Sequence, residues 1–183
     1  MDSLLITIIE KPDESLLKKI NRFSKENWGE HDESATELRN NYFDTPNIVV
    51  IASLNDEIIG IQLVFLRKIT YKDVEITLAG LGGLVAHKDL RHKGIASILL
   101  KATLKNLASK NIDVAMLCMD IEVLGHLCRR VGFIPLGRSY YFFDKNGKEK
   151  LESGGMIAVV NNKSVFDLIL NTQDSLVVGS SNF

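Results

Sequence analysis

A short basic turn that opens into an amphipathic helix is the part of this sequence with the clearest chemistry. The turn reads Arg91-His92-Lys93-Gly94-Ile95-Ala96, and the apolar residues that follow have the spacing of one buried helical face: Ile95, Ile98, Leu99 and Ala102. At a helix N-terminus the first amides lack partners and the dipole is positive, so the amides of residues 91–96 could bind an anion. Gly94 and Ala96 leave room for a phosphate, and three side chains add positive potential, those of Arg91, His92 and Lys93. The pattern predicts a pyrophosphate-binding loop.

Two better-known phosphate-binding loops do not match this segment. The chain has no G-x-x-x-x-G-K-[ST] sequence, and Gly80-Leu81-Gly82-Gly83 ends too far before the helix to form the dinucleotide-binding fingerprint. A basic turn before a helix is also common in proteins that bind no phosphate. The rest of the chain must therefore decide between an anion site and an ordinary turn.

The composition is that of a globular protein. The 183 residues are 45% hydrophobic, which suits one domain spanning 1–183 with a full core. The formal net charge of −1 gives no general reason to expect binding to nucleic acid or to an anionic membrane. The first residues resemble no secretion signal, and no apolar stretch approaches the roughly 18 residues that span a bilayer. We expect a soluble cytoplasmic protein.

The two cysteines do not indicate a metal site. Cys118 and Cys128 lie ten residues apart and have no His or Cys partner at the spacing of a zinc site. Two cysteines in a chain of this length favour reduced thiols. No metal is therefore expected.

The order of the expected elements indicates an α/β fold with a mixed sheet. A strand comes first, then a helix after Pro12-Asp13, then three strands joined by turns at Asn55-Asp56 and Tyr71-Lys72-Asp73. Because helices join some strands and tight turns join others, the sheet should be mostly antiparallel with helices packed against it. The expected strands are 4–10, 47–54, 58–70, 74–86, 112–118, 137–143 and 156–160, with a final apolar run at 176–178, and the later helices are 33–40, 94–109 and 121–131.

In these residues the chain resembles the GNAT superfamily of acyl-CoA N-acyltransferases. The family signature [Q/R]-x-x-G-x-[G/A] at a helix start reads Arg91-His92-Lys93-Gly94-Ile95-Ala96 here, and it follows the strand end Leu84-Val85-Ala86. A second family element, a helix that closes with Gly-Phe, corresponds to Val131-Gly132-Phe133. Within the superfamily, residues 115–133 look most like the branch that contains aminoglycoside 2'-N-acetyltransferases and nodulation acyltransferases.

The resemblance implies a GNAT-like sheet in which two central strands, ending at Leu84–Ala86 and at 112–118, splay into a V. The thioester of acetyl-CoA, the implied acyl donor, would sit in that V. The pyrophosphate of coenzyme A would lie on the amides of residues 91–96, and the pantetheine arm would lie beside Leu84, Val85 and Ala86 as an added strand would. A backbone N–H near Val85 would polarise the thioester carbonyl.

The proton donor departs from the family pattern. Most of these enzymes protonate the leaving thiolate with a Tyr four residues before the Gly of Gly-Phe, and that position is Cys128 here. Cys128 is either a weak thiol donor or a small buried residue of the helix. Tyr140 and Tyr141 either place a hydroxyl in the site from the next strand or pack in the core.

A general base is equally unassigned. The strand before the loop has an acid only at its start, Glu75, which is too far from the thioester. Asp120, close to Glu122, is either a base or the N-cap of the following helix. In the aminoglycoside-acetylating branch, chains that end in an aromatic residue can present their terminal carboxylate to the amine. The same placement here would use Phe183.

The resemblance therefore predicts an acetyltransferase that modifies a primary amine of a small molecule by direct transfer in a ternary complex. Trp28, Glu30 and Asp32 either line the acceptor pocket, where the acids would attract a cationic amine, or belong to a solvated loop. The competing interpretations are a longer acyl donor, a protein acceptor, and a coenzyme A-binding module with weak or no catalysis. Relatives are commonly dimeric, and a homodimer is compatible with this sequence.

Overall fold

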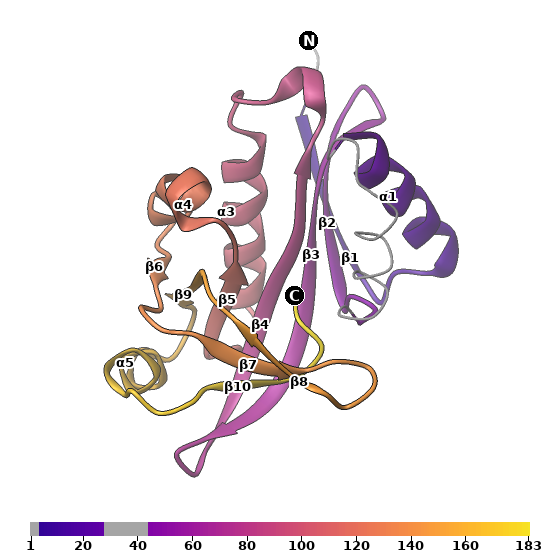
Figure 1. Cartoon of the computed structure of the whole chain (residues 1–183). Coiled ribbons are helices and arrows are strands. Elements are labelled where there is room, and N and C mark those ends of the chain that lie inside the picture. Colours follow the sequence, from indigo (N-terminus) through magenta and orange to yellow (C-terminus); the bar gives the residue numbers. More distant parts are fainter. Residues whose placement is uncertain (1–3, 28–43) are drawn as a thin grey trace.

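One long sheet, covered on both faces, forms the centre of the molecule (Figure 1). The structure is a computed structural model that describes residues 4–27 and 44–183. Its seven strands lie in the order β1-β2-β3-β4-β5-β9-β6, and all neighbours are antiparallel except β4 and β5. The expected mixed, mostly antiparallel sheet is confirmed. The strands are β1 (Leu4–Glu10), β2 (Ile48–Leu54), β3 (Glu57–Tyr71), β4 (Val74–Ala86), β5 (Val114–Cys118), β6 (Ile134–Pro135) and β9 (Gly155–Val159).

Two tight turns produce the antiparallel centre of this sheet. Asn55 and Asp56, between β2 and β3, have φ angles of 50° and 64°, and Lys72 and Asp73, between β3 and β4, have φ angles of 52° and 60°. Two consecutive left-handed residues form the turn whose twist matches that of the flanking strands. Both predicted hairpins are confirmed.

Helices cover the two faces of the sheet. α3 (Ile95–Ala108) and α4 (Ile121–Arg129) lie on one face, and α1 (Glu14–Asn27) lies on the other (Figure 1). α1 begins where Asp13 Oδ1 accepts a hydrogen bond from Leu16 N at 2.7 Å, and it buries Ile20 and Phe23 against the sheet. α3 buries Ile95 and Leu99 of its predicted apolar face. The other two residues of that predicted face, Ile98 and Ala102, are half-buried, so the helical spacing identified the buried face of α3 in part.

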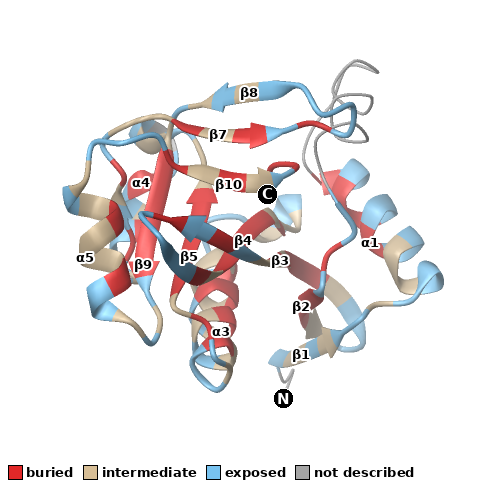
Figure 2. Ribbon diagram, turned by 90° about the horizontal axis from the view of Figure 1, so that it is seen from below, coloured by how far each residue is buried: buried red, intermediate tan, exposed pale blue. Residues whose placement is uncertain are grey.

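A small second sheet lies on the same face of the long sheet as α1 (Figure 2). Its strands lie in the order β10 (Val177–Ser180), β7 (Tyr140–Phe143) and β8 (Glu149–Glu152), with β10 parallel to β7. Its buried side chains pack on the long sheet in a cluster that contains Phe65, Leu78, Met116, Tyr140, Phe142, Val178 and Phe183. The C-terminal strand is therefore part of the core.

Four elements were not predicted from the sequence: β6, β8, the short 3₁₀ helix η1 (Lys88–Leu90) and the helix α5 (Lys163–Asn171). The local signal for α5 was its N-cap, since Asn162 Oδ1 accepts a hydrogen bond from Val165 N at 3.1 Å. Val165 and Ile169, four residues apart, are buried. Only nine residues form this helix, too few for its periodicity to stand out. The helix expected at 33–40 lies outside the described residues.

The long sheet opens between its two parallel strands. β4 and β5 pair from Leu78 opposite Val114 to Leu81 opposite Leu117, and there the pairing ends. β4 continues to Ala86 and remains paired with β3 as far as Ala86 opposite Gly60. The predicted V-shaped splay is confirmed, and beyond Leu81 no described strand pairs with the edge of β4 that faces β5.

No helix within residues 4–27 and 44–183 is long and apolar enough to cross a membrane. No group of three or more His, Cys, Asp or Glu side chains in them could hold a metal ion.

Candidate functional site

The basic turn forms the N-terminus of α3, at the end of the splayed strand. A short 3₁₀ helix, η1 (Lys88–Leu90), follows β4, and Gly94 is the N-cap of α3 with φ 83° and ψ 4°. In the described part of the chain, no group accepts a hydrogen bond from the amides of residues 91–97, and the first helical bond runs from Ile98 N to Gly94 O at 3.0 Å. These donors lie at the positive end of a 14-residue helix, an arrangement that can bind an anion.

Gly94 keeps this site open. A Cβ atom at Gly94 would meet nothing within 4 Å, so no neighbour requires the glycine for space. The left-handed φ requires it instead, because side chains strain that conformation. His92 and Lys93 are exposed beside it and contribute positive potential to the mouth of the helix.

The Arg91 side chain has a positioning role that the sequence did not indicate. Its Nη2 donates a hydrogen bond to Asn27 O, at the end of α1. Asn27 is buried, and its Oδ1 accepts a hydrogen bond from Lys88 N at 3.0 Å, while its Nδ2 donates to Phe23 O at 2.9 Å. Asn27 therefore fastens the loop to α1. Neither contact has a local signal, since more than 60 residues separate the partners.

A β-bulge shapes β4 at the splay. Leu63 lies opposite Gly82 and Ile61 lies opposite Val85, so β4 has one residue more than β3 across this step. Gly83, inside the bulge, has φ 56°. Gln62 is buried opposite the bulge, and its Nε2 donates to Gly82 O at 2.5 Å. The side-chain amide thus stabilises backbone where the regular ladder is interrupted.

The ladder also determines which β4 amides face the opening. His87 N donates to Ile59 O at 2.8 Å, and hydrogen-bonded pairs recur at every second residue of an antiparallel ladder. The backbone of Val85, opposite Ile61, therefore points toward β3, whereas the alternate residues Leu84 and Ala86 present theirs to the open edge. The N–H groups near Val85 that could donate to a thioester carbonyl are therefore those of Leu84 and Ala86, and the N–H of Val85 itself faces β3.

The C-terminal residue lies against β4 beside the opening (Figures 1 and 2). A Cβ atom at Gly80 would overlap the Phe183 ring, and one at Gly82 would lie 2.5 Å from the Phe183 carboxyl carbon. The Phe183 ring stacks on Tyr140, with centroids 6.0 Å apart and planes 4° apart. The two glycines therefore make the space that Phe183 occupies, and its carboxyl group stands where β4 and β5 separate.

Tyr140 holds this chain end. It is fully buried, its hydroxyl donates to Asn182 Oδ1 at 2.8 Å, and burial raises its pKa well above the usual range. The phenol therefore stays protonated. Tyr141, the other candidate on this strand, is half-buried.

Cys118, the last residue of β5, lies near Tyr140, and its Sγ donates to Ser153 O at 3.1 Å. Burial raises the pKa of the Cys118 thiol to about 11. It is therefore a neutral thiol near pH 7, at the edge of the opening where β5 ends.

The other acidic candidates lie at less favourable places. Asp120 is exposed, and its Oδ1 accepts a hydrogen bond from Glu122 N at 3.0 Å, which supports the N-cap interpretation for α4. Glu75 pairs with Lys68 at the end of β4 opposite the splay, as its sequence position predicted. Trp28, Glu30 and Asp32 lie outside the described residues.

Cys128, at the position of the family tyrosine, is a core residue of α4. Its side chain is fully buried among residues of α3 and the sheet, and its Sγ lies 3.6 Å from Met119 Sδ. Burial raises the pKa of its thiol to about 11. This environment supports the packing interpretation, and the thiol-donor interpretation remains to be tested.

A model of the acetyltransferase (GNAT) domain family matches residues 9–134, more than half of the chain. The chain belongs to the GNAT acetyltransferase family. The match covers the splay, the bulge and the loop before α3, and it ends just after the Gly-Phe pair. No curated protein sequence matches the chain.

Solved GNAT structures share this fold at low sequence identity. The GNAT family N-acetyltransferase YhbS from Escherichia coli, in complex with CoA, aligns over 98% of this chain and 91% of its own, with TM-score 0.63 and 16% identity. The ribosomal-protein-S18-alanine N-acetyltransferase from Escherichia coli aligns over 85% and 94%, with TM-score 0.55 and 13% identity. A GCN5-related N-acetyltransferase from Kribbella flavida covers 77% of this chain, with TM-score 0.57 and 18% identity, but the chain spans only 35% of that protein.

The burial of Cys128 leads to a first prediction. Removing the buried sulfur atom leaves a small cavity, so Cys128→Ala should lower the free energy of unfolding by about 1–2 kcal/mol. Cys128→Ser should lower it further, because it buries a hydroxyl without a partner. Denaturant unfolding measures both effects. If the thiol were the proton donor instead, Cys128→Ala would lower kcat far more than Cys128→Ser, whose hydroxyl can donate.

Proposed function

We propose that this protein transfers an acetyl group from acetyl-CoA to a primary amine of a small molecule, by direct transfer in a ternary complex. The observation that most directly supports this proposal is the run of unpaired amides at residues 91–97. These amides follow β4, whose pairing with β5 ends at Leu81. Family membership supports acyl transfer in general. The similar fold of the Escherichia coli protein in complex with CoA supports the choice of donor.

The residues of the loop and of β4 fit coenzyme A. The amides of residues 91–97 can donate to a pyrophosphate, Gly94 presents no side chain in front of them, and Lys93 adds positive charge. Beyond Leu81 the free edge of β4 matches the amide groups of a pantetheine arm. Acetyl-CoA supplies a thioester as the acyl source. Leu84 and Ala86 offer backbone donors to its carbonyl oxygen.

The carboxyl group of Phe183 is our candidate general base. It stands against Gly82, on the face of the sheet opposite α3. An ammonium acceptor must lose one proton before its nitrogen can attack, and the carboxylate would accept it. The nitrogen then bonds to the acyl carbon as the carbon–sulfur bond breaks, and a second proton from the nitrogen balances the departing thiolate. Asp120 is the less favoured base, because α4 uses its Oδ1 as a cap.

Trp28, Glu30 and Asp32 remain candidates for the acceptor pocket, because the two acids would attract a cationic amine. An assay of thiol release from acetyl-CoA with polyamines, aminoglycosides, amino acids and peptides tests the acceptor class. If the protein bound coenzyme A but acetylated none of these acceptors, the alternative of a coenzyme A-binding module would be favoured. That alternative is motivated by Cys128, which stands where most family members have a Tyr.

Donor binding can be tested at Gly94. A Gly94→Val variant places a β-branched side chain at a left-handed position in front of the free amides, so its affinity for coenzyme A should fall by about tenfold or more. Gly147→Val is the matched control, since Gly147 has φ 75° and equally open surroundings but lies in the turn between β7 and β8. Calorimetry with folded protein measures both. Equal, undiminished affinity in the two variants would contradict the loop assignment.

The base can be tested by adding one glycine after Phe183. The addition converts the carboxylate at Gly82 into a peptide carbonyl, so kcat should fall by about tenfold or more while coenzyme A affinity is retained. Phe183→Leu is the comparison, because it keeps the carboxylate but loses the stacking on Tyr140, and it should chiefly reduce stability. Steady-state kinetics and thermal unfolding measure the two effects. Unchanged turnover in the extended chain would remove Phe183 from the mechanism.

A further inference from the structure

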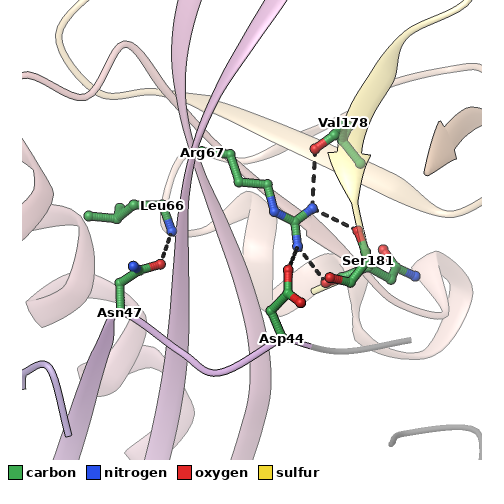
Figure 3. Close-up of polar contacts among 7 residues, drawn as sticks. Asp44, Asn47, Leu66, Arg67, Val178 and Ser181 are labelled. Carbon is green, nitrogen blue, oxygen red and sulfur yellow. Dashed lines mark hydrogen bonds and ion pairs between the residues drawn. The ribbon is translucent and has the colours of Figure 1, made fainter. Parts of the chain in front are cut away.

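Arg67, on β3, binds the last residues of the chain (Figure 3). Its Nη1 donates to Val178 O at 3.2 Å and to Ser181 O at 2.7 Å, and its Nη2 donates to Asn182 O at 2.8 Å. The side chain is only 10% exposed. A single buried guanidinium thus donates hydrogen bonds to three backbone carbonyl groups in the segment that leads to Phe183.

The backbone of residues 178–182 adopts unusual conformations beside the Arg67 guanidinium. Gly179 has φ 98° and Ser181 has φ 61°, a left-handed conformation that is uncommon for a residue with a side chain. Ser181 N donates to Phe143 O at 2.6 Å on the other side of the turn. Such a conformation persists only where the surroundings enforce it, and here the bonds to Arg67 and Phe143 do so.

The charge of Arg67 reaches two further groups. Its Cζ lies 5.4 Å from the centroid of the Phe183 ring, a cation–π distance, and its Nη2 lies 3.9 Å from Asp44 Oδ2. Burial lowers the pKa of Arg67, and the Asp44 carboxylate opposes this. A guanidinium remains charged under such conditions. The same cation therefore touches the chain end and Asp44.

We propose that Arg67 is a positioning residue for the acceptor half of the site: it holds residues 178–182 so that the Phe183 carboxyl group stands at Gly82. This inference rests on the proposed function. Arg67 pairs with Leu78, eight residues before Ala86, so about 27 Å of strand separates it from the phosphate loop. Arg67 therefore acts on the acceptor and the base and leaves the binding of coenzyme A unchanged.

Arg138 provides a matched control. Its Nη2 also donates to a backbone carbonyl, Ile169 O at 2.7 Å, and to the Tyr71 hydroxyl at 3.3 Å. Arg138 is half-buried in the same layer but bonds to α5 and β3 instead of the chain end. Removing either guanidinium should destabilise the protein. A loss of kcat/KM that occurs only in the Arg67 variants therefore reports on the positioning of Phe183.

The experiment compares Arg67→Met, Arg67→Lys and Arg138→Met in the whole chain. Arg67→Met should lower kcat/KM for the amine by about thirtyfold or more, with the dissociation constant of coenzyme A within about twofold of wild type. Arg67→Lys keeps the positive charge but loses the planar pair of donors, so its kcat/KM should lie between those of Arg67→Met and wild type. If Arg67→Met does not fold, Arg67→Lys takes its place in the comparison. Arg138→Met should leave kcat/KM within about threefold. Equal losses in Arg67→Met and Arg138→Met would overturn the proposal.

A readout without catalysis separates this proposal from the proposed function. Carboxypeptidase should release Phe183 from the Arg67 variants much faster than from wild type or Arg138→Met, because only the Arg67 variants free the chain end. Equal release rates in all proteins would overturn the positioning role even if the enzyme is active. Faster release from the Arg67 variants, in a protein that shows no turnover, would support the role of Arg67 and count against the proposed function alone.

Discussion

The site depends on a change of hydrogen-bonding partners along β4. From Leu78 to Leu81 the strand is paired on both edges, and beyond Leu81 it is paired, among the described strands, only with β3. Backbone groups that lose a partner inside a protein need another one. Among the described residues, the edge at Leu84–Ala86 and the amides at the start of α3 are therefore two groups of unpaired backbone groups beside the opening, separated by residues 87–90, whose amides are bonded. The proposed donor substrate has the peptide-like arm and the anion that these two groups fit.

The glycines of β4 make room on the face of the strand that contacts Phe183. Gly80 and Gly82 accept the ring and the carboxyl carbon of Phe183, where a Cβ atom would clash, and Gly83 takes the left-handed conformation of the bulge. The run Gly80-Leu81-Gly82-Gly83 does not form a dinucleotide-binding turn. It is a strand without side-chain bulk, so that another part of the chain can lie directly on its backbone. This close approach is what brings Phe183 to the point where β4 and β5 part.

Features with a local signal were predicted from the sequence, whereas features made by distant residues were not. The amphipathic helices, the hairpin turns at Asn55-Asp56 and Lys72-Asp73, and the loop before α3 each depend on neighbouring residues, and the splay followed from the family signature. The fastening of the loop by Asn27 and the capture of the chain end by Arg67 join residues more than 60 and more than 110 positions apart. Spacing within a segment carries no information about such pairs. α5 and β8 were missed because short elements show too little periodicity.

The loop before α3 and Phe183 meet β4 at different places. The loop follows the end of that strand and begins α3, which packs on one face of the long sheet, while Phe183 lies against Gly82 on the other face. The point where β4 and β5 separate lies between them along the strand. Under the proposed function the acyl donor would therefore extend along β4 from the loop, and the amine would meet the thioester from the side of Phe183.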